Sequence, residues 1–168
     1  MPYKSPIPKL PDKHMRLVGI IAAHWEHAER VVERALAAIM KLEWDRVDML
    51  LVNIPFRAKC DLITAHARVL EQRDPRTQKK SSEWVEFNKT MDGLKAAYAL
   101  RNKYVHATWD ATIPRKLIRR TLRTKGGRID SGGEAVTVKE MERAAHIIVK
   151  ATVAFVRWCR KYDIELRQ

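Results

Sequence analysis

Apolar residues recur every three or four positions over four long stretches of this 168-residue chain, which is the spacing of one face of an α-helix. The first stretch is expected to be capped by Asp12, and its apolar face runs to Leu42. The second opens at Asp45 and should be divided at Pro55, because proline removes a helical donor and clashes with the preceding turn. The N-terminal half is therefore predicted to be helical.

Two further helices are expected in the C-terminal half. The third stretch starts near Ser82 with acidic residues in its first turn, and its apolar face extends to Val105. The last is predicted to begin at a capping box of Thr137 and Glu140, and its apolar face runs to Tyr162. Together the four patterns predict an all-α fold, a helical bundle of about four to five helices.

The segment 115–133 separates the third and last helical patterns and contains glycine pairs at 126–127 and 132–133. We expect it to be either a β-hairpin that turns at 125–128 or a short irregular loop. Its few apolar residues do not decide between these two structures.

Outside these patterns the chain lacks helical periodicity. Residues 1–11 hold four prolines and are predicted to form an extended N-terminal arm. The stretch 71–82 is polar, contains an Asp-Pro pair, and is predicted to be a solvated loop. No internal repeat or boundary is visible in the remainder, so residues 12–168 are predicted to form a single domain.

Charge points to a class of partner. The chain has 33 Lys and Arg against 20 Asp and Glu, a formal net charge of +13. Such a surface attracts polyanions, of which RNA and DNA are the usual ones and anionic lipid is less common. No stretch approaches the ~18 apolar residues that a membrane span needs, and the N-terminus has no apolar core of a secretory signal. Cys60 and Cys159 lie within helical patterns and are expected to be reduced core thiols of a cytoplasmic protein.

Positive charge is concentrated in the insertion before the last helix. This segment is either a basic arm that holds RNA phosphates with little sequence preference or a solvated charged loop. The seven candidate RNA-binding residues are Arg115, Lys116, Arg119, Arg120, Arg123, Lys125 and Arg128.

Arg101 occupies a position that the spacing of the third helix reserves for an apolar residue. Burying a guanidinium without a partner is costly, so this group must be paired, reach water or face a cleft. In one interpretation its stem covers the core while its head is solvated. In another it pairs with a carboxylate of the first helix, Glu26, Glu29 or Glu33.

Asn102 and His106 lie four residues apart and share a helix face at about 40°, whereas Arg101 and His106 are separated by about 140°. A straight helix therefore does not aim Arg101 and His106 at one point. Convergence requires the reach of the arginine, a distorted helix end, or a second copy across a two-fold axis. We favour a homodimer, because an isologous interface brings each motif opposite itself.

Arg101, Asn102 and His106 resemble the signature of the HEPN superfamily, all-α domains that carry an arginine, a polar residue (often Asn) and a histidine four to six positions after the arginine. The layout over roughly residues 12–163 is similar to that of uncharacterised bacterial HEPN-like proteins. The chain departs from many of these relatives at Ala107, where they have glycine.

The resemblance implies a metal-independent endoribonuclease that needs no cofactor. In that reaction the ribose 2′-OH attacks the adjacent phosphate and leaves a 2′,3′-cyclic phosphate. His106 would exchange the proton of the leaving 5′-oxygen, Arg101 would stabilise charge on the phosphate, and Asn102 would orient His106 or a phosphate. A toxin or defence role, with an antitoxin or regulatory protein as partner, belongs to the same expectation.

Other interpretations remain open. One alternative is a non-catalytic HEPN-like module that binds nucleic acid or nucleotides, and another is a protein-interaction module. His106 would then be a histidine near a helix end, where the dipole favours its charged form. Tyr98 and Tyr104 are expected to pack rather than stack on bases. His24 and His27 are three apart, but no second pair stands at zinc spacing, so no metal site is predicted.

Overall fold

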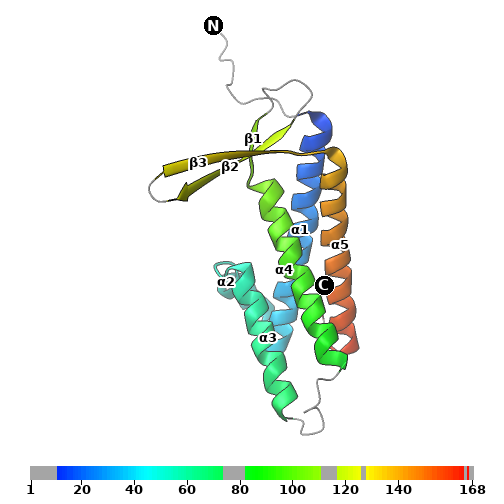
Figure 1. Ribbon diagram of the computed structural model, residues 1–168. Helices are drawn as coiled ribbons and strands as arrows, with labels where there is room; N and C mark the ends of the chain where they lie inside the picture. Colours follow the sequence, from blue (N-terminus) through cyan, green and yellow to red (C-terminus); the bar gives the residue numbers. More distant parts are fainter. Residues whose placement is uncertain (1–10, 74–81, 111–116, 126–127, 165, 167–168) are drawn as a thin grey trace.

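A computed structural model describes residues 11–73, 82–110, 117–125, 128–164 and 166. Within them, α1, α4 and α5 pack side by side along their lengths, α3 lies against α1 and α4, and α2 contacts α1 (Figure 1). The predicted all-α bundle is therefore confirmed. The five helices are α1 (Asp12–Met40), α2 (Trp44–Leu51), α3 (Phe56–Arg73), α4 (Ser82–Val105) and α5 (Val138–Lys161).

The helix starts follow the local chemistry, with one correction. Asp12 does not cap α1: it is the first helical residue, Pro11 stands at the cap position, and no side chain caps this end. The Asp12 carboxylate instead lies in the first turn, where the helix dipole favours negative charge. The predicted capping box of α5 is confirmed, since Glu140 N donates to Thr137 Oγ1 (3.2 Å) and Thr137 N donates to Glu140 Oε2 (2.7 Å).

Pro55 divides α2 from α3, as predicted. α3 begins directly after it, and the Lys59 N–H donates to the Pro55 carbonyl, so the proline opens the first turn of a helix rather than interrupting one. The loop predicted from Glu71 begins too early, because α3 continues to Arg73, whereas the predicted start of the third helix near Ser82 is confirmed. Residues 74–81 lie outside the described residues, as do residues 1–10 of the expected N-terminal arm.

The insertion is a β-hairpin, which decides between the two alternatives left by the sequence. β2 (Ile118–Lys125) pairs antiparallel with β3 (Arg128–Ala135), and Lys125 is opposite Arg128 at the turn. A short strand that the sequence did not predict, β1 (Thr108–Asp110), pairs with the other edge of β2. The order of the sheet is β1-β2-β3, and β2 and β3 project away from the helices (Figure 1).

The core lies between α1, α4 and α5. Trp25, Phe87 and Phe155 are buried there, and Trp25 packs against Phe56 and Tyr98 at centroid distances of 4.5 and 5.4 Å. Tyr104 is buried as well, so the expectation that both tyrosines pack is confirmed. No helix among the described residues combines the length and apolar character needed to cross a membrane.

Both cysteines are buried and free, as expected for core thiols. Burial raises the pKa of Cys60 and of Cys159 to about 12, because the apolar surroundings disfavour the thiolate. The two thiols therefore stay protonated at neutral pH and act as small apolar side chains.

Candidate active site at the end of helix α4

The three motif residues lie where α4 ends. Val105 is the last helical residue, His106 lies just beyond it, and the chain enters β1 at Thr108. Because His106 is outside the helix, its side chain is not held to the direction that a continued helix would impose. The end of the helix before His106, rather than a continued straight helix, therefore accounts for the convergence.

Arg101 contacts both other members of the motif within one chain. Its Nη1 donates to Asn102 Oδ1 at 2.9 Å and contacts His106 Nε2. A guanidinium has only donors, so a hydrogen bond in this contact requires His106 Nε2 as the acceptor. The arrangement brings together one cation, one amide and one imidazole that can hold or release a proton.

This geometry corrects the argument for a dimer. A straight helix would separate Arg101 from His106, which favours a two-fold axis, but the helix end and the reach of the arginine bring them together in a single copy. A second copy is therefore not needed to complete the motif, and the homodimer stays a prediction without this support.

The motif reaches the surface. His106 is exposed, whereas Arg101 and Asn102 are half-buried. Nε of Arg101 is buried and has no hydrogen-bond partner among the described residues. The contacts of the guanidinium with Asn102 and His106 are both made by Nη1. The carboxylates considered as partners for Arg101 form ion pairs with other cations. Glu26 pairs with Arg30, Glu29 pairs with Lys59, and Glu33 pairs with both.

An ion-pair bridge ties the hairpin to the same end of α4. Glu134 on β3 accepts from Lys103 Nζ of α4 and from Arg119 Nη2 of β2, both at 2.9 Å. These hydrogen bonds raise the pKa of Lys103 and lower the pKa of Glu134, because each favours the charged form. The bridge sets the position of β2 and β3 relative to the motif.

The first strand is fixed to the hairpin in a similar way. Arg120 donates to Asp110 Oδ2 through Nε (2.8 Å) and Nη2 (2.5 Å), and Thr108 is the register partner of Arg120. Since β1 begins two residues after His106, this pairing places the start of β2 beside the motif.

The basic residues predicted to bind RNA fall into three groups. Arg119 and Arg120 lie on β2, and each pairs with a carboxylate. Arg123, Lys125 and Arg128 belong to β2 and β3, but their side chains lie outside the described residues, and Arg115 and Lys116 lie outside them entirely. The structure thus brings the basic strand to the motif and shows that part of its charge is locally neutralised.

A second cluster was missed by the sequence analysis. Lys59 of α3 is only 1% exposed, and its Nζ donates to Glu29 Oε1 (3.0 Å) and Glu33 Oε1 (2.6 Å) of α1. Glu29 Oε2 also accepts from Trp25 Nε1 at 3.1 Å. Burial by itself lowers the pKa of Lys59, but the hydrogen bonds to the two carboxylates outweigh it, and the pKa is raised.

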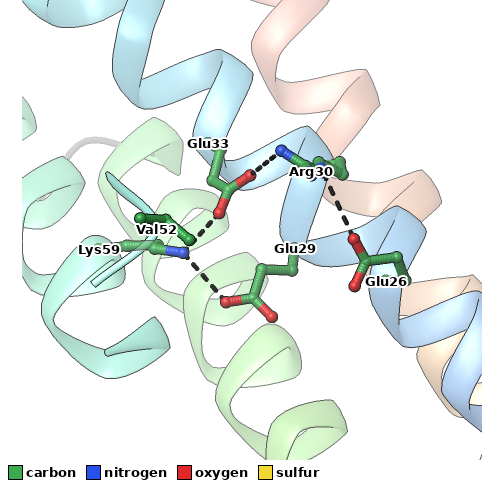
Figure 2. A pocket seen from close by; sticks show the side chains of 6 residues that line it. All are labelled: Glu26, Glu29, Arg30, Glu33, Val52 and Lys59. Carbon is green, nitrogen blue, oxygen red and sulfur yellow. Dashed lines mark hydrogen bonds and ion pairs between the residues drawn. The ribbon is translucent and has the colours of Figure 1, made fainter. Parts of the chain in front are cut away.

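Lys59 forms the floor of an open pocket of about 400 Å³, and Figure 2 shows its ammonium pointing between the two carboxylates. A signal for it was present in the sequence, because Lys59 stands at helical spacing between the buried residues Phe56 and Ile63. The adjacent Cys60 is apolar and also fits that face, so the spacing alone does not indicate that Lys59 is buried. The pocket is lined by Glu26, Glu29, Arg30, Glu33, Val52 and Lys59.

No protein-family model, curated protein or solved structure matches the chain. Within the part of the chain that the structure describes, no group of three or more His, Cys, Asp and Glu side chains could hold a metal ion. His24 and His27, the pair considered for metal binding, are both exposed on α1.

Proposed function

We propose that this protein is a cytoplasmic, metal-independent endoribonuclease of HEPN type, with its site at the C-terminal end of α4. The observation that carries the proposal is the contact of Arg101 with Asn102 and His106 at an accessible position in one chain. The net charge of +13 and the basic hairpin beside this site support a polyanionic substrate.

The chemistry assigned to each residue follows from its groups. A bound RNA phosphate takes the place of His106 beside the Arg101 guanidinium, whose donors match phosphate oxygens and stabilise the charge that develops in the transition state. The ribose O2′ forms a bond to phosphorus while the bond from phosphorus to O5′ breaks. Water removes the 2′-OH proton, and the protonated His106 gives its proton to O5′.

Asn102 supports this reaction by positioning Arg101. Its side-chain oxygen accepts from Arg101 Nη1, which holds the guanidinium at the helix end after His106 has turned toward the leaving group. We therefore assign Asn102 as a positioning residue. The products are a 2′,3′-cyclic phosphate and a free 5′-hydroxyl, and they follow without any metal ion or cofactor.

The test is cleavage of mixed RNA in the presence of EDTA, with the product ends mapped. Wild type should produce 2′,3′-cyclic phosphate ends, and His106→Ala and Arg101→Ala should each lower the rate at least about a hundredfold, as expected for loss of an acid–base or charge-stabilising group. The matched controls His146→Ala and Arg157→Ala change exposed residues of α5 and should cleave like wild type.

Cleavage that survives in His106→Ala, or that needs a divalent cation, contradicts the proposal. A second candidate is a non-catalytic module that binds nucleic acid, favoured by the basic strand β2. In that case wild type binds RNA in a salt-sensitive way without cleaving it, and His106→Ala binds equally well. A toxin or defence role with an antitoxin or regulatory partner remains a prediction from the resemblance.

A further inference from the structure

Three large apolar side chains are more than half exposed where α2 ends. They are Met49 (71%), Leu50 (51%) and Val52 (68%), within a run of four residues. Large apolar side chains on a surface usually occur singly, and a group of them marks a site of interaction.

This apolar group borders the pocket above Lys59. Val52 belongs to both, since it is exposed beside Leu50 and also lines the pocket (Figure 2). The side chains that line the pocket include three carboxylates and two cations, so its formal net charge is −1, whereas the whole molecule has a net charge of +13. We call Met49, Leu50, Val52 and the pocket the α2 surface.

The carboxylates at the mouth of the pocket can accept further hydrogen bonds. The side chain of Glu26 is 69% exposed and makes one long contact, 3.4 Å, with Arg30. That of Glu29 is 27% exposed, and each carboxylate oxygen can accept a second donor in addition to Lys59 or Trp25. The hydrogen bonds from the buried ammonium of Lys59 fix the positions of the Glu29 and Glu33 carboxylates at one side of the pocket.

We propose that the α2 surface binds a segment of another protein that carries an Arg or Lys beside large apolar side chains. The cation enters the pocket and contacts Glu26 and Glu29, while the apolar residues cover Met49, Leu50 and Val52. Arginine and large apolar side chains that anchor in dehydrated pockets are the usual centre of such interfaces.

The charge of the pocket selects this occupant over others. RNA and anionic lipid present phosphates, which the excess carboxylate repels. A second copy docked around a two-fold axis would bring two pockets of the same sign close together. A basic and apolar protein segment matches both halves of the α2 surface, and this inference does not depend on ribonuclease activity.

The test is selection of a random-peptide library on the purified full chain. Enriched peptides are expected to contain Arg or Lys flanked by large apolar residues. In titration calorimetry, Met49→Ser/Val52→Ser and Glu26→Gln should each weaken a selected peptide about tenfold or more, the size of an interface anchor. Val85→Ser and Glu142→Gln change comparably exposed residues of α4 and α5 and should leave binding unchanged.

Each remaining outcome overturns the proposal. These are the absence of enriched peptides, enrichment of peptides without a cation, equal binding by the variants, and displacement of the peptide by RNA. Sedimentation of the free protein adds one more: if wild type self-associates and Met49→Ser/Val52→Ser does not, the occupant is a second copy. All altered side chains are exposed, and urea midpoints equal to wild type confirm that the variants fold.

Discussion

Lys59 and Arg101 are two cations at inward-facing helix positions, and the chain accommodates them differently. Lys59 is buried and meets two carboxylates of α1, so its charge is matched inside the protein. Arg101 stands one turn from a helix end, where its guanidinium reaches an amide and an imidazole near water. Removing a buried cation leaves its carboxylates without a partner, whereas Arg101 contacts no carboxylate among the described residues, so its charge is available for a ligand.

Replacing Lys59 tests the first of these roles. Lys59→Met should lower the free energy of unfolding by about 3–5 kcal/mol, because it leaves the carboxylates of Glu29 and Glu33 without their cation in a buried site. Urea denaturation measures the loss. The control is Lys95→Met, which removes an exposed pair with Asp61 and should cost less than about 1 kcal/mol. Equal effects of the two changes would show that the buried pairing is not stabilising.

The candidate site could be found from residue pattern, but its geometry could not. An arginine on an apolar helix face stands out in the sequence, so Arg101 was identified. The contact with His106 depends on where α4 stops, and the helix pattern continues to Val105 without showing what the next residue does. Lys59 was missed because its partners lie 26 and 30 residues away on another helix.

At the scale of elements, the sheet joins the end of α4 to the start of α5. The bridge of Lys103, Glu134 and Arg119 crosses from helix to strand, and Asp110 with Arg120 links the two strands nearest the motif. The glycine pairs and basic residues predicted a hairpin as one of two alternatives. β1 escaped prediction because a strand of three residues has no periodicity, and it forms a strand where it pairs with β2.

Acid should loosen this bridge. Because the pKa of Glu134 in the folded protein lies below its ordinary value of 4.5, its stabilisation is complete above that pH and is lost as the pH falls through the lowered pKa. Hydrogen-exchange protection of the β2 amides should therefore fall in that range. Glu134→Gln should show lower protection already at neutral pH, and this position should then cause no further decrease in acid. Glu140 at the start of α5 also has a lowered pKa, so any decrease that remains in the variant is assigned to that group.

Gly133 allows β3 to lie close to β2. A Cβ at this position would meet Ile118 Cγ2 at 2.9 Å, so Gly133→Ala should destabilise the protein by about 1–3 kcal/mol, the usual cost of overpacking. Ile118→Ala in the same chain should recover part of the loss. Gly19→Ala in α1, with nothing within 4 Å of the added Cβ, should instead stabilise it by about 0.5–1 kcal/mol. Thermal unfolding of the variants distinguishes these outcomes.

At the scale of the whole molecule, two surfaces of opposite character lie on one bundle. The motif and the basic strand occupy one end of α4, and the acidic pocket lies between α1 and α3 beside the end of α2. The helical architecture followed from the apolar spacing of the chain. The pocket did not, because it depends on how α2 and α3 turn back against α1 after Pro55.

Because the motif is complete in one copy, activity should not depend on association. We expect the rate of RNA cleavage per molecule to stay constant when the protein is diluted, with the oligomeric state followed by sedimentation at each concentration. A rate per molecule that falls in parallel with dissociation of a dimer would contradict this and would favour a site formed by the motifs of two copies. A heterodimer of His106→Ala and Arg101→Ala chains that regains activity would do the same.

The indole of Trp25 contacts one residue of the pocket and one residue of α4, the helix that carries the motif. Its Nε1 donates to Glu29 at the pocket, and its ring packs on Tyr98, one helical turn before Arg101. A ligand that draws the Glu29 carboxylate toward itself must weaken that bond and change the polarity around the ring. The intrinsic fluorescence of this tryptophan, isolated by replacing the other four with phenylalanine, is therefore a built-in optical reporter of occupancy in the pocket.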